Sequence, residues 1–89
     1  MENAYGIAAY RSRQQVLKMN ELFRRNGIAS SVVSTPKEIS AGCGLSVRFD
    51  LNQSSFVKRL VQNERSGNLI GLYMVRNENG VKRLSALTR

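Results

Sequence analysis

Histidine is absent from this chain of 89 residues, and the sequence holds a single cysteine and a single proline. Without histidine, neither a Ser-His-Asp triad nor a Cys-His catalytic pair can form, and one cysteine cannot build a protein-only zinc site. One cysteine also excludes an internal disulfide, which fits the reducing cytoplasm. The composition therefore predicts a cytoplasmic protein with no metal and no cofactor.

Acidic residues are also few, because 6 Asp and Glu stand against 14 Lys and Arg, which gives a net charge of +8. A charge of this size attracts polyanions without specific recognition. No apolar run approaches the roughly 18 residues of a membrane-spanning helix, and the N-terminus lacks the apolar stretch of a signal peptide. With 42% hydrophobic residues, the chain is expected to form one small, soluble, basic domain with no membrane role.

The spacing of apolar residues predicts an α+β fold with the element order β-α-β-β-α-β. The strands are predicted at 5–10, 28–34, 45–49 and 69–76, with helices at 12–26 and from Asn52 to a break at 65–68. This order is the split β-α-β pattern of ferredoxin-like domains. It predicts a two-layer sandwich in which two helices cover one face of an antiparallel sheet.

Turn and cap residues support these boundaries. Ser12 and Gln15 have the spacing of a capping box, and Gly27 can end the helix in the left-handed region. Asn79-Gly80 is typical of a type I′ turn and predicts a C-terminal β-hairpin. We therefore expect a ferredoxin-like domain at 1–76 and a hairpin and tail extension at 77–89.

The segment that could carry chemistry begins after the second predicted strand. Thr35 can cap a helix, Pro36 fits the first helical position and Glu38 completes a capping box. Because Ala41-Gly42-Cys43-Gly44 follows at once, we expect a single turn and then a tight loop.

Cys43 is the only strong nucleophile of the chain, and its reactive form is the thiolate, with an unperturbed pKa of about 8.5. Gly42 and Gly44 leave the surrounding backbone uncrowded, and successive N–H groups there can form an anion-binding nest. Lys37 and Arg48 are near in sequence and could also favour negative charge. The alternative is an inert, packed cysteine, since free cysteine is among the most often buried residue types.

The segment Thr35–Phe49 resembles the signature of a family of small bacterial proteins described as selenium/sulfur (Se/S) carrier-like. The resemblance covers about residues 5–75. The matching positions are Pro36, Cys43, Gly44, Arg48 and Phe49. The strongly basic balance and the tail 77–89 are not part of the family pattern. The Cys-Pro dipeptide of the better-known sulfur-relay carriers is absent.

The resemblance implies that Cys43 accepts sulfur or selenium as a persulfide or selenosulfide. It implies a carrier rather than an enzyme with its own turnover. Lys37, Arg48 and the N–H groups of Gly42 and Gly44 are then candidates for stabilising the persulfide anion, and Pro36 for shaping the loop. The expected partners are a cysteine desulfurase or another sulfur or selenium donor, and an acceptor.

A second hypothesis rests on charge. Arg11, Lys18 and Arg25 recur every seven residues and would form a basic stripe that contacts nucleic acid nonspecifically or binds an acidic partner. A third hypothesis is a homodimer or larger regulatory assembly with a structural cysteine. The contact would be the terminal hairpin or the outer sheet face, where Tyr73 and Val75 would form a self-complementary patch.

Sequence-specific RNA binding is the weaker form of the charge hypothesis. The sheet face away from the helices could offer Tyr10, Arg48 and Tyr73 for stacking. However, Ser46 and Arg48 occupy the strand where RNA-binding domains of this topology place aromatic residues.

Overall fold

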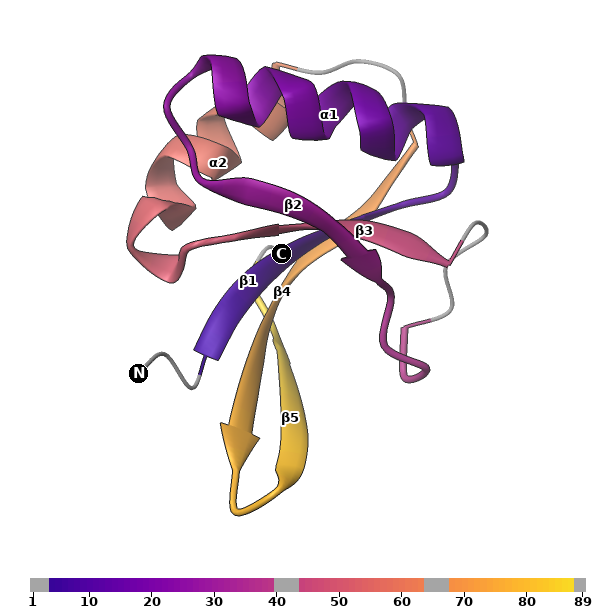
Figure 1. The fold of residues 1–89 in the computed structure, drawn as a ribbon, viewed down its shortest axis with the longest axis vertical. Coiled ribbons are helices and arrows are strands. Elements are labelled where there is room, and N and C mark those ends of the chain that lie inside the picture. The colour runs from indigo at the N-terminus through magenta and orange to yellow at the C-terminus, as the bar shows by residue number, and fades with distance from the viewer. Residues whose placement is uncertain (1–3, 40–43, 64–67, 88–89) are drawn as a thin grey trace.

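The computed structural model describes residues 4–39, 44–63 and 68–87 (Figure 1). The elements are β1 (Ala4–Tyr10), α1 (Arg13–Arg25), β2 (Ser30–Ser34), β3 (Leu45–Phe49), α2 (Ser54–Gln62), β4 (Leu69–Glu78) and β5 (Val81–Ala86). The five strands form one antiparallel sheet in the order β2-β3-β1-β4-β5. Both helices lie on the same side of this sheet (Figure 1). The predicted α+β class is confirmed.

The two helices link strands that are not neighbours. α1 connects β1 to β2, with β3 between them in the sheet, and α2 connects β3 to β4, with β1 between them. Only β2–β3 and β4–β5 are joined directly. The segment with the predicted chemistry is therefore the connection between an edge strand and its neighbour.

α1 begins and ends at the residues that the sequence predicts. The Ser12 hydroxyl accepts the Gln15 backbone N–H at 3.3 Å, and Gly27 follows the helix with a φ of 80°. The helix buries one face against the sheet, where Phe23 meets Phe49 edge to face with ring centroids 6.2 Å apart. Aromatic pairs favour this geometry because the positive edge of one ring meets the negative face of the other.

α2 begins differently from the prediction. A 3₁₀ turn at Leu51–Gln53 precedes it, the Gln53 N–H donates to the Asp50 carbonyl at 3.0 Å, and no side chain caps the helix. Asn52 is therefore not the helix cap. The backbone already turns at Leu51, so Asn52 lies inside the 3₁₀ turn rather than before the first helical residue.

The sheet is covered on both faces. The side toward the helices carries the larger core, formed by Ala8, Tyr10, Val16, Met19, Phe23, Ile28, Val47, Phe49, Val57, Val61 and Leu72. A second cluster on the opposite face contains Ile7, Ala9, Ile39 and Val75. Tyr10, which we expected on the outer face, is fully buried in the helix-side core. Side chains alternate along a strand, so Tyr10 shares the side of Ala8 rather than that of Ile7.

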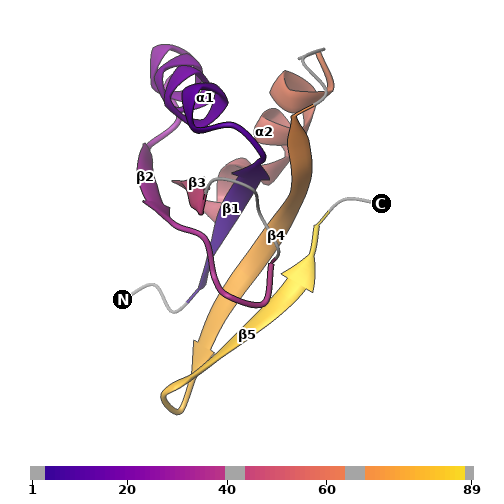
Figure 2. The same cartoon turned by 90° about the vertical axis from the view of Figure 1, so that its right-hand side faces the viewer.

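The C-terminal hairpin has the predicted turn. Asn79 and Gly80 adopt φ values of 53° and 82°, the pair of left-handed conformations that a type I′ turn requires. Across the hairpin, Arg83 forms an ion pair with Glu78 at 3.0 Å. β5 adds an edge strand beside β4, and the hairpin extends beyond the rest of the sheet (Figure 2). None of the described helices has the length and apolar character needed to span a membrane.

We predict that Gly6→Ala destabilises the fold. A Cβ at Gly6 would collide with the Phe49 ring, and that ring is held in place by Phe23. Overpacking of this kind costs about 1–3 kcal/mol, measurable as a lower midpoint in urea unfolding. The double variant Gly6→Ala/Phe49→Leu should lose less than the sum of the two single changes. A Gly6→Ala protein as stable as the wild type would contradict this packing.

Candidate functional site

The candidate site is the connection between β2 and β3. Cys43 and Gly42 lie outside the described residues, while the segments before and after them, 35–39 and Gly44 onward, are described. The structure therefore defines the frame that carries the loop.

Thr35 closes this frame. Its backbone N–H donates to the Gly44 carbonyl at 2.9 Å, which continues the β2–β3 ladder one pair beyond Ser34 and Leu45. Its hydroxyl lies 2.6 Å from the Ser46 hydroxyl, and Ser46 is fully buried. Thr35 is thus not the predicted helix cap. Because it remains in the strand ladder, its side chain turns to Ser46 instead of to a helix start.

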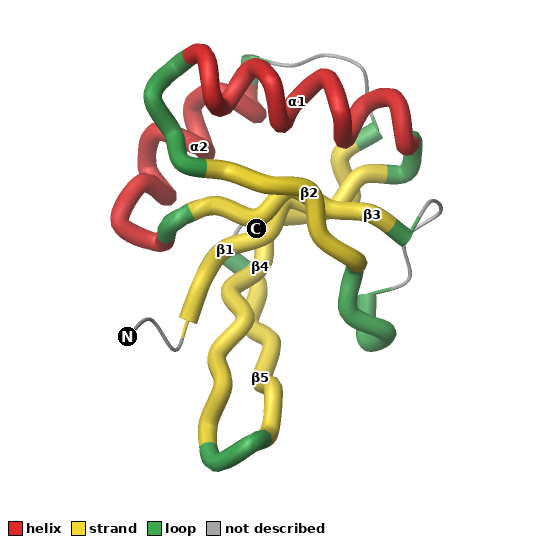
Figure 3. The backbone as a smooth tube through the Cα atoms, viewed as in Figure 1, coloured by secondary structure: helices red, strands yellow, loops and turns green. Residues whose placement is uncertain are grey.

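A single turn follows, as the sequence predicts. The Ile39 N–H donates to the Pro36 carbonyl at 3.0 Å, and no helix forms at 36–39. The Ile39 side chain is buried in the cluster on the helix-free face, beside Ile7 and Ala9. Figures 2 and 3 show the chain after β2 passing beneath the sheet. Burial of Ile39 therefore anchors the turn to the sheet just before the loop.

The two predicted cations lie in different places. Lys37 is exposed in the turn, within the segment that leads to the loop. Arg48 is also exposed, and its guanidinium carbon lies 4.1 Å from the centre of the Tyr5 ring. It is four residues along β3 from Gly44, about 13 Å in an extended strand. Since Tyr5 lies beyond the residue that pairs with Phe49, this side chain leans away from the Gly44 end of β3.

The predicted basic stripe is not uniform. The Arg11 N–H precedes α1 and donates to the Asn68 carbonyl at 2.8 Å, whereas Lys18 and Arg25 are exposed on the helix. Arg25 forms an ion pair with Glu21 at 3.3 Å. The stripe therefore keeps its cations at the surface, and Arg25 is partly neutralised by Glu21.

The sequence did not predict two features of this region. Ser46 lies on the helix-free side of β3, and it is fully buried because that face of the sheet is covered too. The second feature is the contact between the Arg48 guanidinium and the Tyr5 ring. The residues next to Tyr5 and Arg48 in the sequence give no indication of this contact. Both contacts depend on strand register, which a single sequence specifies weakly when the partner strands are distant. Coverage of Ile7 and Ala9 also means that this face is not an open stacking platform.

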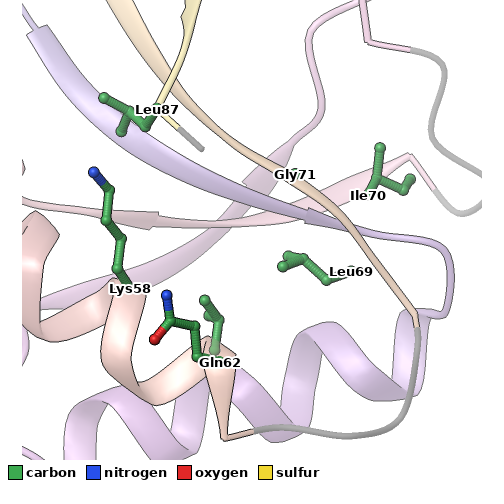
Figure 4. Close-up of a pocket in the computed structure, with 7 residues that line it drawn as sticks. Lys58, Gln62, Leu69, Ile70, Gly71 and Leu87 are labelled. Atoms are coloured by element: carbon green, nitrogen blue, oxygen red, sulfur yellow. The ribbon is translucent and has the colours of Figure 1, made fainter. Parts of the chain in front are cut away.

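Two hollows among the described residues have no predicted site residue in their lining. One of about 560 Å³ lies between α2 and β4, and Lys58 and Gln62 project toward it (Figure 4). Another, of about 430 Å³, is lined by Glu38 and Ile39 of the turn and by residues of β4 and β5. The second hollow directly adjoins the segment that leads to the loop.

The comparison with known protein families assigns this small α+β domain to one family. Residues 5–69 match the family described as "Putative Se/S carrier protein-like", and the chain belongs to that family. The resemblance drawn from Thr35–Phe49 is confirmed. A search of the curated proteins and a search of the solved structures each found no match.

We predict that the hydroxyl pair couples Thr35 to Ser46. Thr35→Val and Ser46→Ala should each destabilise the fold by about 1–3 kcal/mol, because each leaves the other hydroxyl without its partner. The double variant should lose less than the sum, as measured by urea unfolding of all four proteins.

Ser31→Ala is the matched control, since Ser31 is exposed on the same strand, and it should change stability by less than about 0.5 kcal/mol. Strictly additive losses at Thr35 and Ser46 would show that the two hydroxyls do not interact.

Proposed function

We propose that this protein is a carrier that accepts sulfur or selenium on Cys43 as a persulfide or selenosulfide. The observation that carries the proposal is the family match over residues 5–69, which includes this cysteine. The frame described above supports it, because Gly44, next to Cys43 in the chain, is bonded to Thr35. A carrier needs an acceptor thiol on a segment that its partners can recognise, and the paired strands fix the position of Gly44, the residue that follows Cys43 in the chain.

The transfer is a thiol–disulfide-type exchange. The Cys43 thiolate attacks the outer sulfur of a donor persulfide, and a new S–S bond forms. The S–S bond of the donor breaks, and its electron pair leaves with the donor thiolate. The outer sulfur keeps its proton or loses it to water. The reaction needs no external oxidant or reductant, and selenium in the outer position gives a selenosulfide in the same way.

The groups near Cys43 in the sequence would stabilise the persulfide anion to different extents. Lys37 and the N–H groups of Gly42 and Gly44 would stabilise the anion, and Pro36 would set the turn. Arg48 would contribute less, because its guanidinium lies over Tyr5 at the other end of β3. The partners would be a sulfur or selenium donor, such as a cysteine desulfurase, and an acceptor in the reducing cytoplasm. The protein itself would have no turnover of its own.

We also propose how the chain divides into a domain and an extension. We propose that residues 1–76 form a ferredoxin-like domain with the hairpin and tail 77–89 as an extension. The order β2-β3-β1-β4 and the two helical crossovers support this arrangement. β5 then widens the sheet at the edge opposite to β2.

We predict that a cysteine desulfurase with free cysteine loads the wild-type protein with sulfur. Intact-mass spectrometry should detect the adduct, and dithiothreitol should remove it. Cys43→Ser should remain unmodified under the same conditions while keeping the wild-type circular dichroism spectrum. Equal loading of Cys43→Ser, or no loading of the wild type by any sulfur or selenium donor, would contradict the carrier function.

We also predict that Cys43 is alkylated with a pH midpoint below the approximately 8.5 of a free thiol. Lys37→Ala should raise that midpoint by a few tenths of a unit, because in water an exposed cation favours a thiolate several ångströms from it by about 0.5 kcal/mol. Arg48→Ala is the matched control and should raise it less. A midpoint at or above 8.5, or a larger effect of Arg48→Ala, would argue against these roles.

A further inference from the structure

β2 presents an unpaired backbone edge. Among the described strands it pairs with β3 alone, and it lies at one end of the sheet. The Thr35 N–H donates to Gly44, so this pair is a hydrogen-bonded one. Hydrogen-bonded and non-bonded pairs alternate in an antiparallel ladder. Val32 and Ser34 therefore direct their N–H and C=O groups outward, away from β3.

This edge lacks the usual protection. Natural sheets guard their edges with charged side chains, proline or bulges. The opposite edge strand, β5, carries Lys82 and Arg83, whereas β2 reads Ser-Ser-Val-Val-Ser and pairs with β3 in continuous register. The two edges of one sheet thus differ, and β2 is the edge that can accept a further strand.

One face of α1 lies beside the edge. The Ser30 hydroxyl donates to the Asn20 side chain at 2.7 Å, which fixes Asn20 next to β2. Arg13, Leu17 and Arg24 share the helical face of Asn20, at spacings of seven, three and four residues from it. Leu17 is 53% exposed, an unusual exposure for a large apolar side chain here.

This α1 face is basic. Neither Arg13 nor Arg24 forms an ion pair with another described residue, and Glu21 is paired with Arg25. α1 and β2 run in opposite directions (Figure 1). From Asn20 to Arg13 the helix rises about 10 Å, close to the approximately 13 Å from Ser30 to the end of β2. Arg24 and Arg13 therefore flank the two ends of the edge.

Two hollows open at the start of β2. One of about 400 Å³ is lined by Arg24, Gly27, Ile28, Ala29 and Ser30. The other, of about 210 Å³, is lined by Ala29, Ser30, Ser31, Arg48, Phe49 and Asp50. Successive side chains of an added strand would point alternately to the two sides of the sheet. The first hollow favours a carboxylate, since Arg24 is its only charged group, while Arg48 and Asp50 balance each other in the second.

We propose that the edge of β2 binds an extended acidic segment of a partner protein, which pairs with β2 as a sixth strand. The main-chain groups of Val32 and Ser34 bind its backbone, Leu17 contacts an apolar side chain, and Arg13 and Arg24 bind its carboxylates. A second copy of this chain fits less well, because each copy has a net charge of +8 and would bring its own Arg13 and Arg24 to the contact. This docking site does not depend on the chemistry of Cys43.

The test uses a synthetic decapeptide whose odd positions are Glu, Glu, Val, Glu and Glu, with serine at the even positions, so that its carboxylates and its apolar side chain lie on one side. It is titrated into the ¹⁵N-labelled full chain at low salt. We expect the amides of Val32 and Ser34 to shift and to gain protection from hydrogen exchange. The same peptide with lysine in place of each glutamate should bind at least tenfold more weakly. Arg24→Glu should weaken binding of the acidic peptide at least tenfold. Arg59→Glu, which makes the same charge change on α2, should weaken it less than threefold.

A backbone variant tests the strand pairing itself. Ser34→Pro removes an outward donor and leaves the bonds to β3 intact, so we expect at least a tenfold loss, while Ser34→Ala should bind as the wild type does. The proposal is overturned if Arg59→Glu weakens binding as much as Arg24→Glu, or if the β2 amides gain no protection. Concentration-dependent dimers in sedimentation that Ser34→Pro abolishes would also overturn it, because the edge would then hold a second copy.

Discussion

The pairing of Thr35 with β3 is the constraint on which the candidate site depends. Its N–H bonds the Gly44 carbonyl, and its hydroxyl meets the buried Ser46. These two contacts extend the β2–β3 ladder up to the loop and fix where the chain leaves and re-enters the sheet. Without them, Gly44 would have no fixed position relative to β2, since glycine itself restricts the backbone least.

Burial of Ile39 is the second half of this arrangement. By packing on the helix-free face beside Ile7 and Ala9, it gives the sheet a second core and ties the turn after β2 to the first strand. A domain of this size has little interior, so a second cluster contributes directly to its stability. The described part of the connection, residues 35–39, is therefore part of the packing, and Ile39 anchors it to the sheet.

Local patterns predicted the elements well where the signal lies within a few residues. The Ser12 cap, the Gly27 stop, the strand at 45–49 and the Asn79-Gly80 turn all follow from short-range chemistry. The prediction was wrong where contacts between distant strands determine the position of a side chain. Tyr10 lies on the helix side of the sheet, and Thr35 pairs with Gly44 of the neighbouring strand instead of capping a helix. Asn52 was misplaced because a 3₁₀ turn precedes the helix. Family membership, by contrast, followed from one short segment with an unusual Gly-Cys-Gly core.

The account makes the Thr35–Gly44 bond the closure of the β2–β3 frame, and amide hydrogen exchange measures that bond most directly. The Thr35 N–H should exchange as slowly as the inward-facing amides of β2 and β3. Thr35→Val and Ser46→Ala should each lower this protection to a similar extent, because each removes one hydroxyl of the same pair. Exchange of the Thr35 amide at the rate of an unstructured peptide would contradict the account, because the loop would then have no fixed base.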